Sequence, residues 1–286
     1  MNEKIKLLIK SRDTLGECPV WDQFSQSLWR VDIKEKLLHR WMTENHSHKT
    51  WQFQKEISFF SPNKNSSKGL VALDDGIYIM DLENNDLHLV DNPTSNTNQT
   101  RFNDGKCDLR GNLWIGTMDQ MEKHPRGGLF VMSKKKLIRK HRSLTISNGI
   151  DWSPDNKKMY LTDSGKKTIW EFDFDQENLE IQNKRVFAED KDCFPDGLAV
   201  DIEGCLWSAK WDGSAIVKYD PTGSVITVYD LPIKRPTSVV FGGINLDRLF
   251  VTSASIGLKK NSGLEGSVFE IHTNTNGRPQ ALSNIF

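Results

Sequence analysis

The chain has 286 residues, a length that one all-β barrel or propeller can fill with a single architecture. Its 38 Lys and Arg residues balance 38 Asp and Glu residues, so the formal net charge is zero and bulk electrostatics do not favour a nucleic-acid partner. No run of about 18 apolar residues occurs, so we expect no membrane span.

The N-terminal residues "MNEKIKLLIK" alternate charged and apolar side chains, and they lack the apolar core of a signal peptide. The four cysteines form no C-x-x-C pair, so a disulfide framework is not indicated at this length. We therefore expect a cytoplasmic protein in which residues 1–286 form one domain.

A repeat runs along the whole chain, and its anchor is a pair of large apolar residues. The six pairs are Leu28-Trp29, Leu70-Val71, Leu113-Trp114, Met159-Tyr160, Leu206-Trp207 and Leu249-Phe250. Consecutive pairs lie between 42 and 47 residues apart. A period of roughly 40–50 residues is typical of a propeller or a solenoid, so we expect six structural units.

Each unit consists of short apolar or alternating runs separated by Gly, Pro, Asn and Asp, which is the pattern of strands and hairpins. The first unit contains "CPVWD", "SLWRVD", "KLLHRW" and "TWQF", and the fifth contains "GLAVD", "CLWSAKW", "AIVKYD" and "VITVYDL". No segment has the long 3.6-residue periodicity of a helix. The sequence therefore predicts an all-β fold, a six-bladed β-propeller with four-stranded blades.

The two ends of the chain predict how the ring closes. The sixth unit ends after "SVFEI" without a fourth strand, whereas "KIKLLIK" near the N-terminus is a strand without a unit of its own. We expect this N-terminal strand to become the outer strand of the last blade. A ring closed in this way leaves no obvious unpaired edge, so we expect a monomer.

Oxygen-bearing side chains recur just before the expected first strand of each unit. They are Glu17, Ser58, Asn103 with Asp104, Asn148, Asp196, and Thr237 with Ser238. First strands of propeller blades line the central channel, so these residues should converge on one axis. Asp-Gly and Asn-Gly are also ordinary turn pairs, which leaves a structural role open for each position taken alone.

Convergence would bring the carboxylates of Glu17 and Asp196 together with the amides of Asn103 and Asn148. Two facing carboxylates without water are costly unless one is protonated or a cation lies between them. Carboxylate and amide oxygens suit hard cations such as Ca²⁺, Mg²⁺ or Mn²⁺, and they do not resemble a structural zinc site. The sequence therefore indicates one divalent cation at the mouth of the channel.

The motifs "GECPVWD", "RFNDGKCDLRGNLWIGTM", "ISNGIDWS" and "PDGLAVDIEGCLWSA" resemble the regucalcin/gluconolactonase family, which is also called senescence marker protein or luciferin-regenerating-enzyme-like. The resemblance covers nearly the whole chain in the same order. It implies a six-bladed propeller that holds one divalent metal (Ca, Zn, Mn or Mg) and hydrolyses sugar lactones.

The resemblance also implies roles for individual residues. Glu17, Asn148 and Asp196 match the metal ligands, and Asp196 also matches the general base. Arg101 and Asn103 match residues that hold substrate hydroxyls, with Asn103 close to the metal as well. For Arg101, a salt bridge that fixes the "RFNDG" loop is the alternative role.

The loop after "GTM" departs from the animal members of this family, which carry a glutamate three residues further on. Met121 stands at that place here, followed directly by Glu122. Either the loop is shifted so that Glu122 contacts the substrate, or the contact is missing. We take Glu122 as the candidate substrate-binding residue.

The leading hypothesis is a metal-dependent sugar lactonase that acts on a small-molecule lactone, in which the metal polarises the carbonyl and Asp196 assists the attack of water. Another hydrolase on the same scaffold, specific for aryl lactones or phosphotriesters, is the first alternative. A non-enzymatic calcium-binding regulator or a scaffold for protein partners is the second, because propellers host many functions.

Overall fold

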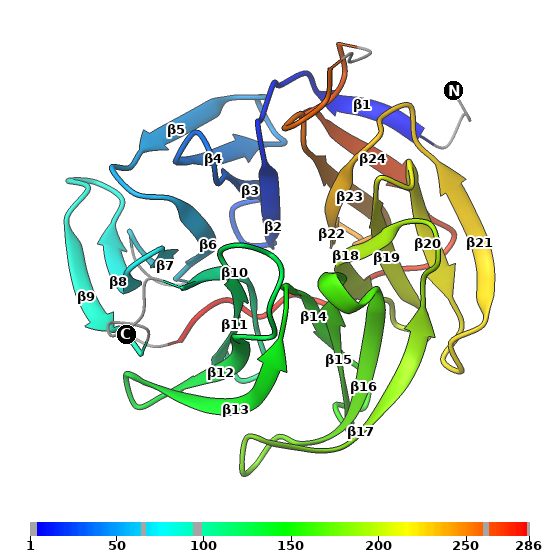
Figure 1. Cartoon of the computed structure of the whole chain (residues 1–286). Coiled ribbons are helices and arrows are strands. Elements are labelled where there is room, and N and C mark those ends of the chain that lie inside the picture. The colour runs from blue at the N-terminus through cyan, green and yellow to red at the C-terminus, as the bar shows by residue number, and fades with distance from the viewer. Residues whose placement is uncertain (1–4, 64–66, 94–98, 260–262, 285–286) are drawn as a thin grey trace.

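The computed structural model describes residues 5–63, 67–93, 99–259 and 263–284. These residues form six four-stranded antiparallel sheets arranged as blades around a central axis (Figure 1). The single helical element within these ranges is a short 3-10 helix, η1 (Ser164–Lys166), and no described helix is long and apolar enough to cross a membrane. The prediction of an all-β, six-bladed propeller is confirmed.

The strands of each blade follow one another in sequence from the axis outward, except in the last blade. The first three blades are β2 (Gly16–Asp22), β3 (Ser27–Asp32), β4 (Leu37–Met42) and β5 (His48–Gln52); β6 (Ile57–Pro62), β7 (Lys68–Leu73), β8 (Gly76–Asp81) and β9 (Leu87–Asp91); and β10 (Thr100–Cys107), β11 (Leu113–Asp119), β12 (Gly127–Ser133) and β13 (Lys136–Leu144).

The fourth and fifth blades repeat this order, and the sixth takes its outer strand from the N-terminus. They are β14 (Ser147–Trp152), β15 (Lys158–Asp163), β16 (Thr168–Asp175) and β17 (Glu180–Glu189); β18 (Phe194–Val200), β19 (Leu206–Trp211), β20 (Ala215–Tyr219) and β21 (Val225–Asp230); and β22 (Pro236–Gly242), β23 (Arg248–Ser253), β24 (Val268–His272) and β1 (Ile5–Ile9).

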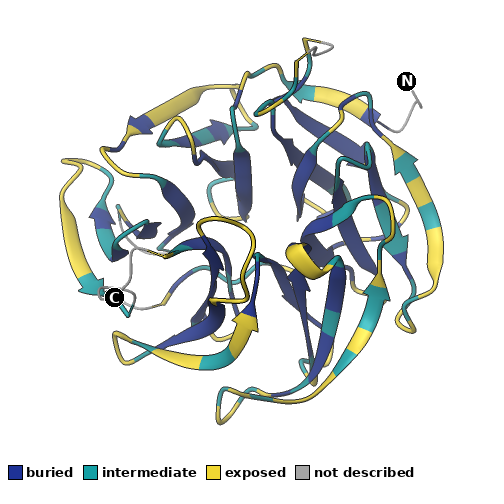
Figure 2. Ribbon diagram, in the orientation of Figure 1, coloured by how far each residue is buried: buried dark blue, intermediate teal, exposed yellow. Residues whose placement is uncertain are grey.

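Burial falls from the axis to the rim (Figure 2). The inner strand β2 and the second strand β3 are buried at every position, because neighbouring blades cover both of their faces. The outer strands β9 and β21 have one face in solvent, and they contain exposed residues such as Leu89 and Val225. This gradient explains why the inner runs of each unit read as continuously apolar.

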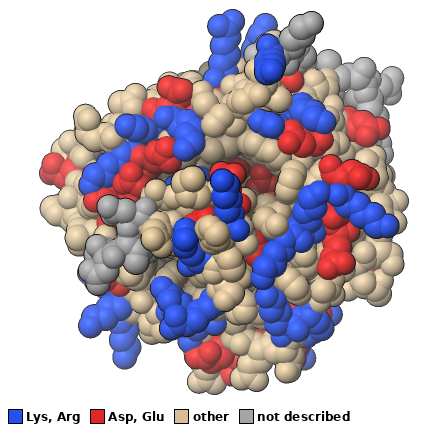
Figure 3. Space-filling model, viewed as in Figure 1, with Lys and Arg blue, Asp and Glu red and all other residues tan. Residues whose placement is uncertain are grey.

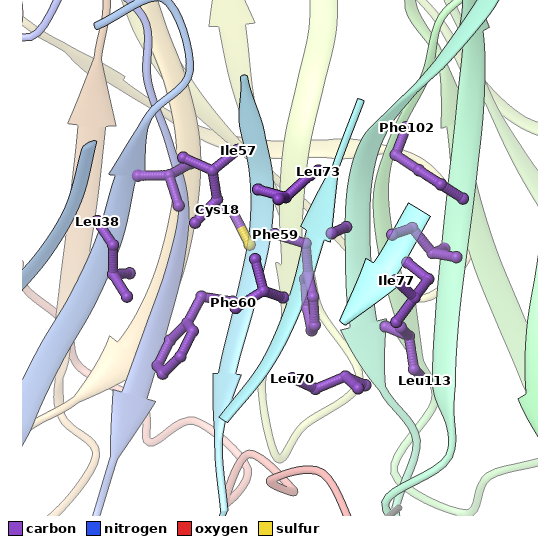
Figure 4. Packing of buried hydrophobic residues seen from close by; sticks show 14 of the residues in the cluster. Cys18, Leu38, Ile57, Phe59, Phe60, Leu70, Leu73, Ile77, Phe102 and Leu113 are labelled. Atoms are coloured by element: carbon purple, nitrogen blue, oxygen red, sulfur yellow. The ribbon is translucent and has the colours of Figure 1, made fainter. Parts of the chain in front are cut away.

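The repeated anchor residues hold adjacent blades together. In several blades the second-strand aromatic ring lies against a ring on the inner strand of the next blade: Trp29 with Phe60 (centroids 4.6 Å apart), Trp114 with Trp152 (6.3 Å), Trp207 with Phe241 (5.8 Å) and Phe250 with Trp21 (5.3 Å). Aromatic pairs in such geometries add stability beyond the area that they bury. Figure 4 shows the apolar packing among the first three blades, with Cys18 on β2, Phe60 on β6 and Phe102 on β10.

The N-terminal strand closes the ring as predicted. β1 pairs antiparallel with β24, with Leu7 opposite Phe269, and Ile5 is 3% exposed. Beyond this strand, Asp13 donates its backbone N–H to the carbonyl of Gly266 in the sixth blade (3.1 Å). Its carboxylate accepts two hydrogen bonds from the buried guanidinium of Arg30 in the first blade, at 2.8 and 3.2 Å. The junction therefore combines a sheet pairing with a buried ion pair.

The C-terminal residues 274–284 cross the ring at the end opposite the beginnings of the inner strands (Figure 1, red). Arg278 donates to the carbonyls of Trp152 (2.5 Å) and Ser153 (2.7 Å), and Gly277 donates its N–H to Leu246 (2.7 Å). Further hydrogen bonds reach the first, second, third and fifth blades through Trp21, Ser61, Gly111 and Ile202. This segment, which the sequence did not reveal, links all six blades and spans one end of the channel.

Candidate functional site

A hollow of about 170 Å³ lies near the axis, at the end of the ring where the inner strands begin. Figure 3 shows this face, with charged side chains of both signs around its centre. The hollow is lined by Leu15, Glu17, Arg101, Asn103, Met118, Glu122, Ile146, Asn148, Ser164, Phe194, Asp196 and Trp211. The six residues to which the sequence analysis assigned a metal-binding, catalytic or substrate-binding role therefore meet at one place, although most of them are far apart along the chain.

The inner strands are irregular where they carry these residues. The pairing with the second strand shifts register between Glu17 and Val20, between Phe102 and Gly105, between Ser147 and Ile150, and between Pro195 and Leu198. An irregularity of this kind breaks the alternation of a strand and re-aims its side chains. The expectation that the polar residues precede the first strands is wrong, because they lie within those strands.

The glycines after the polar residues permit close approach of neighbouring inner strands. A Cβ on Gly149 would lie 2.5 Å from the backbone nitrogen of Leu198 and 2.8 Å from the carbonyl oxygen of Asp196. A Cβ on Gly197 would overlap the side chain of Ser238 on the sixth blade. The Asn-Gly and Asp-Gly pairs therefore mark crowding at the axis, and they are not the hairpin turns that such pairs usually indicate.

A chain of hydrogen bonds connects the polar residues of three blades. Arg101 donates to Oδ1 of Asn103 (2.9 Å), and Nδ2 of Asn103 donates to Oδ1 of Asn148 (2.7 Å). Nδ2 of Asn148 donates to the hydroxyl of Ser164 (2.8 Å), which donates in turn to the carbonyl of Pro195 (2.6 Å). Each amide nitrogen is thus held by the protein, and this fixes the orientation of both amides.

Three buried carboxyl groups influence one another at this site. Burial, and then the charge of Asp104, raise the pKa of Glu17 to about 8. Burial, followed by Glu17 and Asp104, raises the pKa of Asp196 well above its usual range. The pKa of Asp104 is raised to about 6, mainly by burial. The site therefore crowds three carboxyl groups whose ionised forms are disfavoured by burial and, for Glu17 and Asp196, by mutual repulsion.

The donor set fits a divalent cation. Oδ1 of Asp196 is buried and has no hydrogen-bond partner, which is costly for a carboxylate oxygen. Glu17 accepts one bond from the N–H of Cys18 (3.2 Å), and Oδ1 of Asn148 can accept more than the one bond that it has. Crowded carboxylates beside an oriented amide oxygen are the ligands that hard cations accept. Glu17, Asn148 and Asp196 could therefore hold such a cation.

The cationic side of the hollow is formed by Arg101. Its guanidinium donates to the carbonyl of Phe102 (2.9 Å) as well as to Asn103, and Nε lies 3.9 Å from Glu56. Burial lowers the pKa of Arg101, whereas the nearby carboxylates of Glu56 and Glu122 raise it. The 3.9 Å separation from Glu56 leaves Arg101 short of a close ion pair, so it can still turn donors toward a ligand.

The loop that covers the hollow presents Glu122 to it. Glu122 lines the hollow and adopts a left-handed backbone with φ 58°, whereas the neighbouring Met121 is 63% exposed and does not line it. Of the two alternatives left open by the sequence, the structure therefore favours the one in which Glu122 contacts the substrate. The side chain at the Met121 position faces solvent, and the carboxylate one residue later reaches the site.

The hydroxyl residues in the equivalent positions of the second and sixth blades lie apart from the hollow. Thr237 donates to the carbonyl of Gly16 (2.5 Å), and Ser58 makes a long bond to the carbonyl of Ala72 (3.5 Å). Neither they nor Ser238 line the hollow. Of the residues expected to converge, those of the second and sixth blades therefore take no part in the hollow.

Sequence reasoning missed four residues of the site or its surroundings. Asp104 was noted beside Asn103 without a role of its own; it does not line the hollow, but its charge raises the pKa of both Glu17 and Asp196. Phe194 and Trp211 are partners in the β18–β19 pairing and form an aromatic wall. Ser164 lies on η1, and no sequence signal connects it with Asn148.

A second acidic group lies elsewhere in the fifth blade, where Asp201, Glu203 and Cys205 come within 4.8 Å of one another. Oδ1 of Asp201 accepts from the N–H groups of Glu203 (3.0 Å) and Cys205 (2.8 Å). Oδ2 accepts from the indole of Trp207 (3.0 Å) and lies 3.1 Å from Lys218. Because protein donors already occupy both oxygens, this carboxylate caps the hairpin.

Residues 15–255 of the chain match the family described as SMP-30/Gluconolactonase/LRE-like region. The chain is 32% identical to a 6-deoxy-6-sulfogluconolactonase of Pseudomonas putida over 295 residues, which cover 99% of each protein.

Two solved structures have nearly the same backbone. A luciferin-regenerating enzyme superimposes with a TM-score of 0.93 at 31% identity and covers 98% of each chain. A regucalcin from Agrobacterium tumefaciens, described as a calcium-binding protein, superimposes with a TM-score of 0.92 at 29% identity, covering 97% of this chain and 96% of the other.

Proposed function

The chain belongs to the SMP-30/gluconolactonase/LRE-like family, and we propose that it is a metal-dependent hydrolase that opens sugar lactones. One observation carries the proposal. Asp196 lines a hollow that also contains Glu17 and Arg101, and its carboxylate oxygen Oδ1 is buried without a hydrogen-bond partner. The hollow of about 170 Å³ is smaller than the pockets of drug-sized ligands, and it suits a small ring.

In this proposal Glu17, Asn148 and Asp196 hold one divalent cation, with Ca²⁺, Zn²⁺, Mn²⁺ and Mg²⁺ as candidates. When bound, such a cation polarises a carbonyl and lowers the pKa of nearby water. The hydrogen bonds from Asn103 to Asn148 and from Asn148 to Ser164 fix the orientation of the Asn148 amide in the absence of a cation. The protein therefore spends little free energy on reorienting its ligands.

Asp196 is the proposed general base. The attacking water must lose a proton as it adds to the lactone carbonyl, and Oδ1 of Asp196 has no protein donor that would compete for it. The same proton can later be given to the ring oxygen that leaves as the C–O bond breaks. The products are a hydroxyl group and a carboxylic acid, which loses its proton to solvent.

The remaining residues position the substrate. Arg101 keeps its charge at any ordinary pH and offers planar donors to sugar oxygens or to the product carboxylate. Asn103, which also lines the hollow, and the carboxylate of Glu122 complete the polar side. Phe194 and Trp211 form the opposite wall, against which the apolar face of a sugar ring can pack.

The test uses protein stripped of metal with a chelator. Acid release from D-glucono-1,5-lactone is followed in a weakly buffered indicator assay, and Ca²⁺, Mg²⁺, Mn²⁺ or Zn²⁺ is added back in turn. We expect one or more cations to restore turnover in the wild type, and Asp196→Ala to lose both turnover and metal binding measured by calorimetry. Asp192→Ala, an exposed carboxylate in the preceding loop, is the matched control. Turnover by Asp196→Ala at the wild-type rate would remove Asp196 from the mechanism.

The apolar part of the lining favours a second candidate, a hydrolase for aryl lactones. Met118, Ile146, Phe194 and Trp211 form a surface that an aromatic ring could contact. An aryl lactone such as dihydrocoumarin, assayed in parallel with the sugar lactone, distinguishes the two. A higher kcat/KM for the aryl compound would make it the better description of the substrate.

A further inference from the structure

A basic hollow of about 470 Å³ lies between the third and fourth blades, outside the central site. We use this name for the space lined by Arg139, Lys140, His141, Arg142, Ser143, Lys166 and Lys184. These residues come from β13, from η1 and from β17. Five of the seven side chains carry a positive charge at neutral pH. This concentration is unexpected in a chain whose formal net charge is zero.

Few carboxylates neutralise this charge. Lys140 forms an ion pair with Glu180 on β17. Among the described residues, no carboxylate oxygen lies within 4 Å of the charged nitrogens of Arg139, Arg142, Lys166 or Lys184. The buried carboxylate of Asp163 acts on Lys184 from further away, and it accepts hydrogen bonds from the backbone of Thr145 and Ile146.

The cations repel one another. The pKa of His141 is lowered to about 4, first by burial and then by Lys184 and Lys166. Burial and the charge of Lys166 also lower the pKa of Lys184, and burial together with Arg142 lowers that of Arg139. This repulsion opposes folding, and a bound anion would relieve it.

The charged ends of two of these side chains lie over aromatic rings. The guanidinium of Arg139 lies 4.9 Å from the ring centroid of Phe130, and Nζ of Lys184 lies 3.8 Å from that of Trp170. Nζ of Lys184 also contacts Nε2 of His141 at 3.3 Å. Because these contacts restrict the cations before any ligand arrives, binding would cost less side-chain entropy.

The basic hollow borders the central site. Nζ of Lys166 donates to the carbonyl of Ser143 (3.2 Å) and ties η1 to the end of β13. Ser164 on the same short helix lines the central hollow, as does Ile146, which follows β13. The wall between the two hollows is therefore formed by η1 and by the end of β13 with the segment that follows it, and residues of these segments line both.

We propose that the basic hollow is a second ligand site, which binds a small molecule with at least two neighbouring phosphate or sulfonate groups. Four cations without a close carboxylate exceed what a single monoanion can neutralise. Arg139 and Arg142 provide the planar donor pairs that match tetrahedral oxyanions, and Lys166 and Lys184 provide point charges. The neutral chain as a whole disfavours a long polyanion, so a compact ligand is the better match.

Titration calorimetry with inorganic pyrophosphate and with ethane-1,2-disulfonate tests the site, in buffer without added divalent cations. The wild type should bind one molecule, and Arg142→Gln with Lys184→Gln should weaken binding at least tenfold. The control Lys134→Gln with Lys135→Gln removes the same charge from the adjacent hairpin turn, outside the hollow, and should change the Kd less than twofold. The two probes show whether phosphate or sulfonate is preferred.

Several results would overturn the proposal. They are the absence of saturable binding by either probe, an equal loss of affinity in both double variants, and loss of binding in Asp196→Ala, which would place the anion in the central hollow. Binding of duplex DNA but of neither probe would make this surface a polymer interface instead. Thermal melting of each variant shows that the fold is intact, and hydrolysis of the lactone should be unchanged in both double variants.

Discussion

Ser164 determines which atom Asn148 presents to the carboxylates of the central hollow. An asparagine amide can turn by half a revolution at little intrinsic cost, and the amino group would then face a cation. The hydroxyl of Ser164 accepts from Nδ2 of Asn148 and donates to the carbonyl of Pro195, so the unflipped orientation gives the amide nitrogen an acceptor and the hydroxyl a partner of its own. We regard Ser164 as a positioning residue, because the proposed cation ligand is Asn148 and Ser164 acts only by holding that amide.

Replacing Ser164 with alanine should weaken the binding of a divalent cation by roughly tenfold, as is typical when a residue that orients a metal ligand is lost. Ser164→Thr keeps a hydroxyl and should retain most of the affinity. Calorimetric Kd values for Ca²⁺ and Mn²⁺, measured without substrate, separate this role from any effect on turnover. Equal affinity in Ser164→Ala and the wild type would show that Asn148 is oriented without it.

Glu122 and Met121 provide a matched pair in the loop over the hollow. Glu122 lines the hollow and Met121 is exposed, so only the carboxylate can accept a hydrogen bond from a substrate hydroxyl. We expect Glu122→Gln to raise KM for a sugar lactone several-fold with little change in metal affinity, and Met121→Gln to alter neither. Steady-state kinetics over a series of lactones provide the measurement. An effect of Met121→Gln on KM as large as that of Glu122→Gln would contradict the assignment.

The strand β1 completes a sheet that the last unit of the repeat leaves short. It pairs with β24 along Ile5 to Ile9, and the burial of Ile5 adds an apolar contact to the hydrogen bonds of the sheet. The chain termini of a propeller must be joined by non-covalent contacts alone, so the last blade is where the ring can open. The Asp13–Arg30 pair lies at the same junction.

Deletion of residues 1–10 should therefore lower the melting temperature. Burial of one aliphatic side chain and several strand hydrogen bonds together contribute at least about 3 kcal/mol, and this corresponds to a shift of about 6 °C or more in a protein of this size. Deletion of residues 1–4 alone, which precede β1, is the control and should leave the melting temperature nearly unchanged. If the protein without residues 1–10 melted at the same temperature as the full-length protein, β1 would not hold the ring closed.

The ring as a whole forces like charges together at its axis. Glu17 and Asp196 belong to the first and fifth blades, Asp104 belongs to the third, and closing the ring brings all three within electrostatic reach. Covering the opposite end of the channel with residues 274–284 makes the site approachable mainly from one face. A cation is then the simplest means of lowering the free energy of this arrangement.

The stability of metal-free protein should fall as pH rises. The pKa of Glu17 is raised from 4.5 to about 8, so in this range the folded protein keeps a proton that the unfolded chain releases. The unfolded state then binds fewer protons, and the free energy of unfolding decreases with pH. Thermal melting of chelated protein across this range, compared with Glu17→Gln, measures the effect, and the variant should have the weaker pH dependence.

Added Ca²⁺ should reverse the trend. Below the usual pKa of Glu17 the carboxyl is protonated and binds a cation poorly, whereas near pH 8 it is ionised more readily and the gain in melting temperature should be larger. A shift with Ca²⁺ that is the same at both ends of the range would indicate that the cation binds away from these carboxylates.

The architecture could be predicted from the sequence because each blade repeats the same local pattern of apolar residues and turn residues. The spacing of the anchor pairs counts the blades, and a spare strand before the first unit, together with a last unit that is one strand short, predicts the closure by β1. Glu17, Asn148 and Asp196 were found because each stands at the same place in its unit. Repetition converts residues that are remote in sequence into neighbours, so these features need no knowledge of side-chain contacts.

Only the tertiary structure determined what the repeat does not encode. The pairing of β10 with β11 shifts register at Asn103 and Asp104, and the charge of Asp104 acts on Glu17 and Asp196 in other blades. The short helix η1 brings Ser164 to Asn148. The basic hollow and the crossing of residues 274–284 likewise join segments with no shared pattern. The sequence by itself determined how many blades there are and which residues face the axis. The packing of one blade on the next decided how those residues are oriented and charged.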